Sequence, residues 1–296
     1  MKFLETHVPK PEWLKVGIPS GEVVAFVAEV KQENNLFTVC EEAKCPNRQE
    51  CWSSGTATFM LMGGVCTRAC RFCSVTHGSR PESLDPDEPS NVAEAVRRLG
   101  LKYVVITSVN RDDLPDGGAQ HFAHTITAIR VRNPDTKVEV LIPDFLGENL
   151  DYILNSDPDV IAHNVETVER LTSKVRDPRA NYRKSLKVLR EIKEKNPLKY
   201  TKSSIMVGVG ETWEDLESTF ADLRNIGVDF LTIGQYLRPS MKHMKVEKYV
   251  HPDVFMEMHS RALTHGFKYV VSGPLVRSSY RAGELFLDSL LRRRTP

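Results

Sequence analysis

Strand-like and helix-like segments alternate along most of the chain from residue 59 onward. Runs of β-branched, aromatic and other apolar residues predict six strands, at 59–62, 103–109, 138–142, 160–163, 204–207 and 230–233. Between the strands, apolar residues recur three and four positions apart, as at 186–192 and 213–226. Thr212 and Asp215 have the spacing of a capping box, which predicts where the helix at 213–226 begins.

This serial order predicts the class of fold and the place of the ligands. Strands that alternate with helices imply parallel pairing with right-handed crossovers. We therefore expect an α/β fold, a partial (β/α)6 TIM-like barrel, over residues 59–266. Ligands of such barrels bind at the carboxyl ends of the strands. The loops that follow the predicted strands are polar or glycine-rich, at 63–64, 108–113, 163–166, 208–211 and 234–236.

The two ends of the chain differ from this repeating middle. Residues 1–58 contain several prolines and two amphipathic pieces, which predicts an N-terminal extension packed on the barrel. Residues 267–296 form the predicted C-terminal extension, which includes a strand-like run at 267–271. We find no internal repeat at a fixed spacing and no low-complexity segment.

Composition and charge narrow the class of partner. Forty basic and thirty-nine acidic residues give a net charge of +1, so the overall balance does not indicate a nucleic acid or a membrane surface. No apolar run approaches the roughly 18–20 residues that cross a bilayer. The first residues carry no apolar signal stretch, so we expect a cytoplasmic protein. The run 292–294 is three arginines, which we interpret as a solvated tail without a role.

All six cysteines lie between residues 40 and 73, in two triplets with different spacings. One triplet is Cys66-x3-Cys70-x2-Cys73, directly after the first predicted strand, and the other is Cys40-x4-Cys45-x5-Cys51. Three thiolates are one short of the number that completes a cubane iron–sulfur cluster. Each triplet therefore predicts a separate cluster site with one open position.

Other uses of the cysteines fit the sequence less well. Disulfide frameworks are typical of small secreted domains, not of a 296-residue chain that confines its cysteines to one region. Structural zinc needs four converging ligands, and only Cys70 and Cys73 have the usual paired spacing, with His77 as the nearest supplement. Inert buried thiols are improbable for six residues crowded among basic side chains and glycines. A cluster in a reducing compartment is the favoured interpretation.

The first triplet, with Phe72 before its last cysteine, resembles the signature loop of the radical S-adenosylmethionine enzymes. This resemblance implies that Cys66, Cys70 and Cys73 hold three irons of a [4Fe–4S] cluster. It implies further that the amino and carboxylate groups of S-adenosylmethionine bind the fourth iron. An electron from the cluster would then cleave the sulfonium and give a 5′-deoxyadenosyl radical, which removes hydrogen from an unactivated carbon.

The second triplet, together with the Arg-Ser-Ser-Tyr motif at 277–280, resembles the lipoyl synthases over nearly the whole chain. Further matching stretches occur at 10–15, 43–47, 107–114, 176–182 and 273–277. The resemblance implies a sulfurtransferase of lipoate biosynthesis that places two sulfurs at C6 and C8 of an octanoyl chain on a lysine. Cys40, Cys45 and Cys51 would hold an auxiliary [4Fe–4S] cluster that is consumed as the sulfur source. Its fourth ligand would be a serine of the motif, which maps onto Ser279.

Five residues are weaker predictions for contacts with S-adenosylmethionine. Phe72 adjoins the cluster loop, and three more follow predicted strands two and four: Asn110, Asn164 and Glu166. Arg179 has the chemistry to pair with a carboxylate. Each of these residues is about as well explained by a loop cap, core packing or a surface salt bridge. We interpret His77 and His163 as loop or core histidines, not as metal ligands.

The resemblance also implies partners. The substrates would be octanoylated lipoyl carrier domains, such as the E2 subunits of 2-oxoacid dehydrogenases and the H protein of glycine cleavage. A ferredoxin or flavodoxin would supply electrons, and a cluster-repair protein could rebuild the auxiliary cluster. Two alternatives are a radical sulfur-inserting enzyme that acts on nucleic acid and a zinc-stabilised scaffold. The first would need a basic appendage that the sequence does not show.

Overall fold

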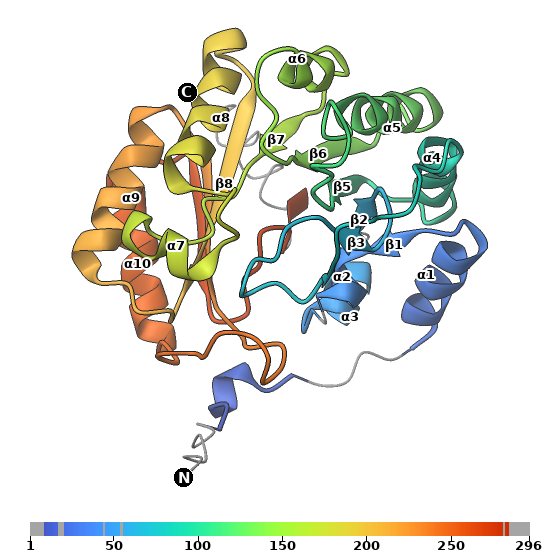
Figure 1. Cartoon of the computed structure of the whole chain (residues 1–296). Helices are drawn as coiled ribbons and strands as arrows, with labels where there is room; N and C mark the ends of the chain where they lie inside the picture. The colour runs from blue at the N-terminus through green and yellow to red at the C-terminus, as the bar shows by residue number, and fades with distance from the viewer. Residues whose placement is uncertain (1–8, 17–20, 44, 54–55, 281, 284–296) are drawn as a thin grey trace, which may run out of the picture.

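The computed structural model describes residues 9–16, 21–43, 45–53, 56–280 and 282–283 (Figure 1). The arginine run at 292–294 and parts of both expected extensions lie outside these residues. In the described chain one eight-stranded sheet has the order β1-β2-β5-β6-β7-β8-β9-β10. Its strands are β1 (Phe37–Thr38), β2 (Thr56–Leu61), β5 (Tyr103–Ser108), β6 (Lys137–Leu141), β7 (Val160–Ala162), β8 (Tyr200–Val207), β9 (Phe230–Gln235) and β10 (Tyr269–Gly273).

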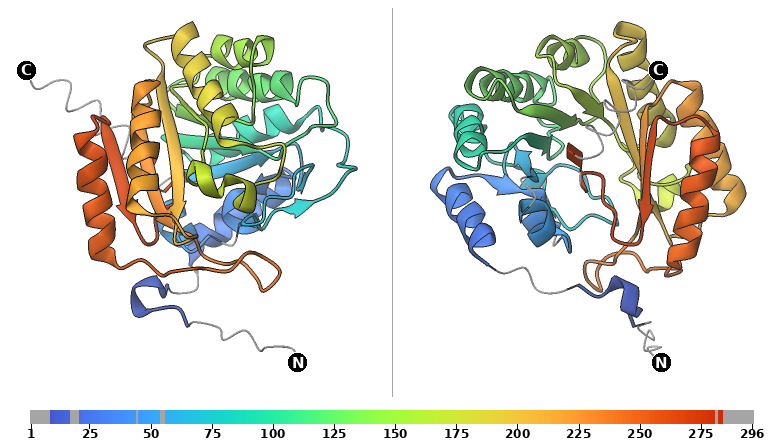
Figure 2. Two further views of the ribbon diagram at one scale, coloured as in Figure 1. Left: turned by 60° about the vertical axis from the view of Figure 1, so that its left-hand side comes forward. Right: turned by 180° about the vertical axis from the view of Figure 1, so that it is seen from behind.

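The sheet is parallel except at one edge, where β1 pairs antiparallel with β2. All six predicted strands are confirmed, and the strand-like run at 267–271 becomes β10, which pairs in parallel with β9. The sheet curves, with the large helices on its outer side (Figure 2). No pairing joins β10 to β1 or β2 in the described chain. The expected partial barrel is therefore confirmed.

Helices follow most strands and cover the outside of the sheet. The longer helices are α1 (Glu22–Glu33), α4 (Glu88–Arg98), α5 (Ala119–Arg132), α6 (Glu148–Asn155), α8 (Tyr182–Lys195), α9 (Trp213–Asn225) and α10 (Pro252–Thr264). The shorter elements are η1 (Glu12–Leu14), α2 (Val39–Glu42), α3 (Arg48–Ser53), η2 (Glu169–Leu171), α7 (Thr172–Val175) and the paired strands β3 (Val65–Cys66) and β4 (Thr76–His77).

The predicted start of α9 is confirmed in detail. Thr212 Oγ1 accepts a hydrogen bond from the backbone N–H of Asp215 (3.3 Å), and the Asp215 carboxylate accepts one from the N–H of Thr212 (2.9 Å). These bonds satisfy two backbone donors that the first turn leaves without partners. Leu216, Phe220 and Leu223 then face the core, as the spacing of three and four predicts.

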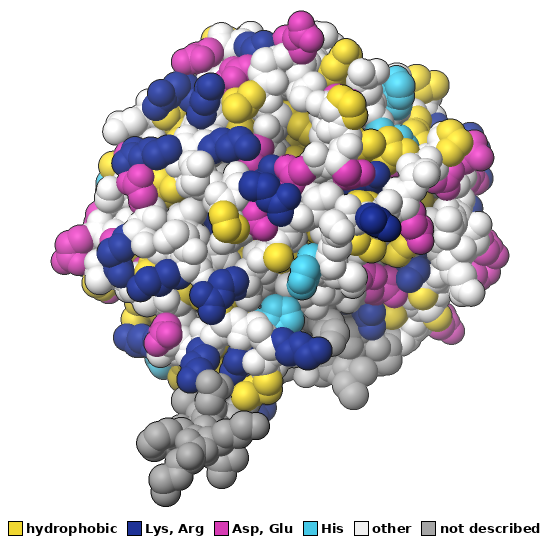
Figure 3. Space-filling view, in the orientation of Figure 1, with side chains coloured by type: hydrophobic (Ala, Val, Ile, Leu, Met, Phe, Trp, Pro, Cys, Tyr) yellow, Lys and Arg dark blue, Asp and Glu magenta, His cyan; other side chains and the backbone are white. Residues whose placement is uncertain are grey.

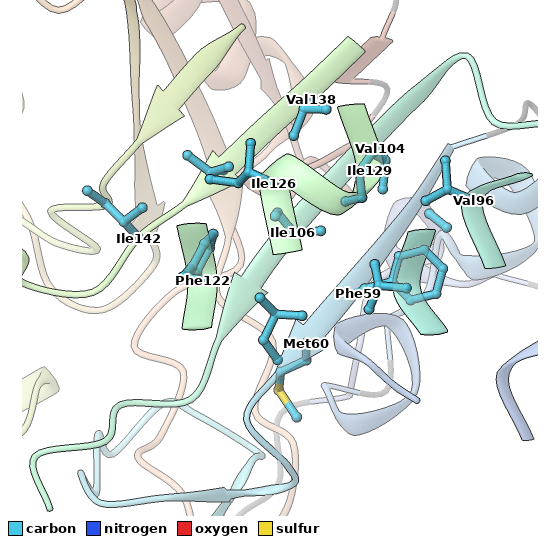
Figure 4. Packing of buried hydrophobic residues seen from close by; sticks show 14 of the residues in the cluster. Phe59, Met60, Val96, Val104, Ile106, Phe122, Ile126, Ile129, Val138 and Ile142 are labelled. Carbon is cyan, nitrogen blue, oxygen red and sulfur yellow. The ribbon is translucent and has the colours of Figure 1, made fainter. Parts of the chain in front are cut away.

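The core lies between the sheet and the helices. In the first half of the chain, alternate strand residues such as Val104, Ile106 and Val138 pack against Phe122 and Ile126 of α5 (Figure 4). Because side chains alternate between the faces of a strand, the residues between them point into the barrel. A second core cluster covers the later half, from Val165 to Val270.

Strand β8 begins four residues earlier than expected. Its first part contains polar residues, which the hydrophobic pattern did not assign to a strand. Thr201, Lys202 and Ser203 are buried although the hydrophobic pattern gives no sign of it. At the other end of the barrel, β2 ends before Met62, whose φ of +68° is outside the strand region. The Met62 N–H donates to both carboxylate oxygens of buried Glu88, each at 3.0 Å.

The C-terminal segment lies against the N-terminal one. The Asn47 side-chain amide donates to the carbonyl oxygen of Leu275 (2.6 Å), and the Tyr280 hydroxyl donates to Glu50 (3.0 Å). These contacts join parts of the chain that are more than 220 residues apart in sequence. They hold residues 275–280 beside α3.

The surface differs from the interior in having mixed charges. On the face shown in Figure 3, Lys and Arg side chains are interspersed with Asp and Glu. Among the described residues, no helix is both long and apolar enough to span a bilayer. This face therefore shows no large patch of one charge among its described residues that would indicate a binding site.

We predict that Gly208→Ala destabilises the protein far more than Gly100→Ala. Both glycines have a left-handed φ, +89° and +59°, but only a Cβ at Gly208 would overlap the Gln235 side chain and the Lys248 carbonyl oxygen. Gly100→Ala should cost about 1–2 kcal/mol from backbone strain, and Gly208→Ala about 1–3 kcal/mol more from overlap. Urea unfolding of both variants measures the difference, and equal losses would contradict it.

Candidate active site

A cavity of about 710 Å³ opens at the carboxyl ends of the strands. Thiols of both triplets line it, namely Cys40, Cys45, Cys66, Cys70 and Cys73. Cys51 is buried and is not among the lining residues. The fold therefore brings the two triplets, which lie in different elements, to one hollow at the barrel mouth.

The sulfur atoms of the first triplet face backbone N–H donors. Cys66 Sγ accepts from the N–H groups of Arg68 (3.4 Å) and Asn110 (3.3 Å). Cys70 Sγ accepts from the N–H of Asp177 (3.3 Å). Donors of this kind stabilise negatively charged sulfur, because hydrogen bonds to a charged acceptor are the stronger ones. The loop is thus arranged for thiolates.

Ion pairs fix this loop to its neighbours. Arg68 is buried, and its guanidinium bonds Asp112 (2.8 Å) and Asp144 (2.5 Å). Burial by itself would raise the pKa of Asp144, but His163 and Arg68 lower it to about 2. Asp144 therefore stays ionised at neutral pH and holds Arg68 beside the cysteines.

Without a metal, burial favours the neutral form of two of these thiols, Cys70 and Cys73. Burial raises the pKa of Cys73 to about 12, and the charges of Cys70 and Cys66 act in the same direction. Burial also raises the pKa of Cys70. A buried thiolate needs a compensating positive charge, which cluster iron supplies because its ligands must be deprotonated.

A zinc site and a cubane cluster require different arrangements of their ligands. Among the described residues, no three His, Cys, Asp or Glu side chains are arranged to hold a single ion. A tetrahedral zinc site requires its ligands to converge on one metal, whereas the thiolates of a cubane bind separate irons. All six cysteines are thiols, not disulfide partners. The thiols of the first triplet are therefore free to act as ligands.

The second triplet is assembled by two short helices and the turn between them. Cys40 lies in α2, Cys45 in the turn and Cys51 in α3. Burial raises the pKa of Cys40 to about 12, and the charges of Cys45 and Cys51 add to the effect. The three sulfurs therefore act on one another, as expected for ligands of one group.

Ser279 lies beside this triplet although it is far away in sequence. Its Oγ accepts a hydrogen bond from Thr58 Oγ1 (3.0 Å), and the backbone of Thr58 in turn hydrogen-bonds the Cys40 thiol. Ser279 also lines the cavity. The fold thus brings together the three cysteines and the serine that the resemblance assigns to the auxiliary cluster.

Two buried donors next to the second triplet fit an iron–sulfur group. Arg48 Nε has no close hydrogen-bond partner in the described chain, and the Trp52 side chain hydrogen-bonds the Cys40 thiol. Trp52 adjoins Cys40, and the Arg48 guanidinium lies over the Trp52 ring at 5.4 Å. Sulfide and thiolate are suitable acceptors for such donors, and outer hydrogen bonds of this kind orient metal ligands.

Four of the five residues expected to contact S-adenosylmethionine line the cavity: Phe72, Asn110, Asn164 and Glu166. Asn164 Nδ2 donates to Glu166 (3.1 Å), while Asn164 Oδ1 is buried without a hydrogen-bond partner. Glu166 has a φ of +66°, an uncommon conformation that is often found at functional sites. Burial raises the pKa of Glu166. These oxygens suit a ligand ammonium or hydroxyl.

Arg179 does not line the cavity. Its guanidinium pairs with Asp177 (2.8 Å) and Asp112 (3.4 Å) and donates to the carbonyl oxygen of Thr67 (2.6 Å). Asp177 in turn accepts a hydrogen bond from the N–H of Ala69 (2.9 Å). Arg179 and Asp177 therefore hold the cluster loop from outside.

The histidines have ordinary structural partners. His163 is buried, with Nδ1 at 2.9 Å from the Ile142 carbonyl oxygen and Nε2 at 3.0 Å from Ser185 Oγ. Burial lowers the pKa of His163. His77 is exposed in β4.

The sequence did not single out two arginines that line the cavity. Arg176 is buried and donates to Ser185 Oγ (2.8 Å), and Arg277 lies close enough to Cys45 to affect its pKa. Both belong to stretches that match the lipoyl synthases, at 176–182 and 273–277. Arg277 also begins the Arg-Ser-Ser-Tyr motif, but neither the motif nor the stretches indicated a separate role for either arginine.

Comparison with known families supports the motif assignment. The model of the radical SAM superfamily matches residues 60–223. A lipoyl synthase of Myxococcus xanthus is 57% identical over 286 residues, which cover 96% of this chain and 96% of the relative. A lipoyl synthase of Deinococcus radiodurans is 56% identical and covers 94% of this chain and 85% of the relative.

Solved structures agree on the fold alone, because their sequence identities are low. The FeFe-hydrogenase maturase HydG of Carboxydothermus hydrogenoformans superposes with a TM-score of 0.59 at 11% identity, over 90% of this chain and 77% of that one. Methylornithine synthase superposes with a TM-score of 0.56 at 10% identity, over 93% and 88%. Taken with the near full-length identities, the chain belongs to the lipoyl synthase family of the radical SAM superfamily.

Proposed function

We propose that this chain is a radical S-adenosylmethionine sulfurtransferase that inserts two sulfur atoms, at C6 and C8, into an octanoyl chain on a lysine of a carrier domain. Membership of the lipoyl synthase family supports this reaction. The observation that supports the residue assignment is a single cavity lined by thiols of both triplets and by Ser279. One substrate chain in that cavity would lie within reach of both sites.

The cofactors are two [4Fe–4S] clusters and S-adenosylmethionine. We assign Cys66, Cys70 and Cys73 to the cluster that binds S-adenosylmethionine. We assign Cys40, Cys45, Cys51 and Ser279 to the auxiliary cluster. When bound, these groups supply the radical that removes hydrogen and the sulfide that replaces it.

The protein's own residues bind and orient the reactants. Asn164 Oδ1 and the Glu166 carboxylate are proposed acceptors for the ammonium or ribose hydroxyls of S-adenosylmethionine, because both residues line the cavity and Asn164 Oδ1 has no hydrogen-bond partner in the described chain. Phe72 and Asn110 also line the cavity and are proposed to contact the adenosyl part. Arg179 is reassigned from ligand contact to positioning of the cluster loop, since its charge is already paired.

We propose a second role for Ser279, which is to make the auxiliary cluster easier to dismantle. A serine oxygen is a harder donor than thiolate and is poorly matched to cluster iron. Its hydroxyl already has a partner in the protein, Thr58, at 3.0 Å. Thr58 would therefore offer the Ser279 hydroxyl a hydrogen-bond partner whenever that hydroxyl is not bound to the auxiliary cluster.

The substrates are lipoyl carrier proteins. We propose the E2 subunits of 2-oxoacid dehydrogenases and the glycine cleavage H protein as carriers, a ferredoxin or flavodoxin as electron donor, and a repair protein for the auxiliary cluster. The six thiols support a reducing compartment, for which we propose the cytoplasm. We also propose that the chain has three functional parts. Residues 1–58 are the N-terminal extension that carries the auxiliary cysteines, residues 59–266 are the partial barrel, and residues 267–296 are the C-terminal extension that carries the Arg-Ser-Ser-Tyr motif.

A single-turnover assay tests the function. The protein is reconstituted anaerobically with isotopically labelled sulfide, then given S-adenosylmethionine, a reductant and an octanoyl-lysine peptide. We expect labelled sulfur at both C6 and C8, because the protein itself carries the sulfur. Thiolated product without label would contradict the sacrificial cluster, and absence of any thiolated product would contradict the proposed reaction.

Cysteine variants should separate the two sites. Cys66→Ala should abolish formation of 5′-deoxyadenosine, because the open-site cluster is lost. Cys40→Ala should retain that cleavage but give no thiolated product. In each variant about half of the iron of two cubanes should be missing. Iron analysis and product chromatography measure both effects, and undiminished thiolation by Cys40→Ala would remove the auxiliary site from the mechanism.

Replacing Ser279 tests its role in release. Ser279→Cys should keep the auxiliary iron but lower sulfur transfer at least about tenfold, because thiolate is the better match for cluster iron. Ser279→Ala is the matched control, which should lose auxiliary iron during purification. Normal product yield from Ser279→Cys would count against a release role.

A further inference from the structure

Arg277 is a half-buried cation of the cavity wall that pairs with no carboxylate of the described chain. Its Nη1 donates to the carbonyl oxygen of Val276 (2.6 Å), and its other guanidinium nitrogens have no hydrogen-bond partner among the described residues. The buried arginines Arg68 and Arg111, by contrast, pair with aspartates at 2.8 Å. Arginine stays charged in proteins, and a charge removed from water is costly unless it is paired. The charge of Arg277 is therefore available to an anion in the cavity.

Hydrogen bonds hold Arg277 beside the second triplet. The backbone N–H of Asn47 hydrogen-bonds the Cys45 thiol, and the side-chain amide of Asn47 donates to the Leu275 carbonyl oxygen (2.6 Å). The N–H of Tyr280 donates to the carbonyl oxygen of Arg277 itself (3.0 Å). Both Cys45 and Arg277 line the cavity. Asn47 is thus a direct link between a cysteine of the triplet and the segment that carries Arg277.

The end of β9 leaves room for this segment. Gly234 lies in β9, and a Cβ there would come within 2.1 Å of the Val276 carbonyl oxygen and 3.6 Å of Arg277 Nη1. The first distance is far shorter than a van der Waals contact, so a side chain at position 234 would displace the segment. The barrel on one side and the N-terminal segment on the other therefore fix the place of Arg277.

The charge of Arg277 acts on one sulfur of the triplet. Burial raises the pKa of Cys45, and the Asn47 N–H and the Arg277 guanidinium act in the opposite direction. Arg48 also lowers the pKa of Cys45, but Glu41 lies 3.8 Å from the Arg48 guanidinium and shares its charge. Of these two arginines, only Arg277 lacks a carboxylate partner in the described chain.

A cubane cluster held by the second triplet would be an anion. Three thiolates outweigh the positive charge of an oxidised cubane core, and reduction by one electron makes the cluster more negative. Net charge and hydrogen bonds to the sulfurs set the reduction potential of such clusters. A full charge a few ångströms away acts strongly where water is partly excluded. A cation at this position would therefore favour the reduced form and raise the potential.

We propose that Arg277 is the counter-ion of the auxiliary cluster and that its guanidinium raises the reduction potential of that cluster. The inference rests on the proposed function, because it takes the cluster as the group that the second triplet and Ser279 hold. A serine oxygen is poorly matched to cluster iron, and Arg277, two residues earlier, adds electrostatic attraction at the same site. A guanidinium has no lone pair to offer iron. Replacing Arg277 should therefore change the potential of the cluster without changing its set of ligands.

Reduction potentials test the proposal. The full chain is reconstituted anaerobically with both clusters and titrated potentiometrically with dithionite, while electron paramagnetic resonance follows each reduced cluster. Two transitions are expected, and Cys40→Ala identifies the auxiliary one, which that variant should lack. Auxiliary iron that dithionite cannot reduce would contradict a raised potential. Absence of any iron that depends on Cys40 would instead overturn the proposed function.

Arg277→Met removes the charge and keeps a long side chain. The auxiliary midpoint potential should fall, so that the reduced fraction at the native midpoint drops at least about tenfold, or about 59 mV for a one-electron couple. Arg277→Lys keeps the charge and should hold that fraction within about threefold of the native value. An unchanged auxiliary midpoint in fully loaded Arg277→Met would overturn the proposal, and so would equal shifts in the two variants.

Iron analysis decides the outcome if Arg277→Met loses its auxiliary cluster. Loss of auxiliary iron from Arg277→Met but not from Arg277→Lys would support the counter-ion, because the two variants differ in charge. Loss from both variants, with thermal unfolding showing that both are folded, would overturn it. The site would then depend on the shape of the guanidinium and not on its charge.

Arg183→Met is the matched control. Arg183 pairs with Glu169, its side chain is 64% exposed, and neither residue lines the cavity. The same chemical change at this position should move neither midpoint potential. A fall of the auxiliary midpoint in Arg183→Met as large as that in Arg277→Met would overturn the assignment to Arg277.

Discussion

The site depends on one constraint, which is that parallel strands end at the same edge of their sheet. Loops that follow β2, β5 and β7 contribute Cys66, Asn110 and Asn164 to one cavity, and the end of β8 contributes Met206, although these residues span 140 positions of sequence. Each crossover helix buries its apolar side on the outside of the sheet and so fixes where the next loop begins. The chemistry at the mouth is therefore positioned by packing on the outer face.

The two cysteine triplets are held in different ways. The first sits in a loop whose sulfurs accept backbone N–H bonds, and Arg68 and Asp177 anchor it by ion pairs and hydrogen bonds. The second depends on contacts between the ends of the chain, through Asn47 and Ser279. A rigid cage suits a group that is reused, whereas a site closed by a distant segment suits one that is taken apart.

The barrel interior divides into layers of different polarity. The mouth has thiols, amides and carboxylates, the middle combines apolar side chains with the hydroxyls of Thr107 and Ser204, and the Glu139–Lys202 pair lies below it. Such a pair is costly to desolvate and is weak evidence for stability.

Periodicity and spacing in the sequence determined the alternating strands and helices, the capping box of α9 and the two triplets. These are local properties, because a hydrophobic period, a cap or a cysteine spacing is complete within a few turns of chain. Only tertiary structure decided that Ser279 meets Thr58, that Arg179 faces outward while Arg176 lines the cavity, and that Lys202 is buried. A local pattern predicts that a polar residue such as Lys202 is exposed. Its partner, Glu139, is sixty-three residues away in the sequence and comes next to it only when the strands pair.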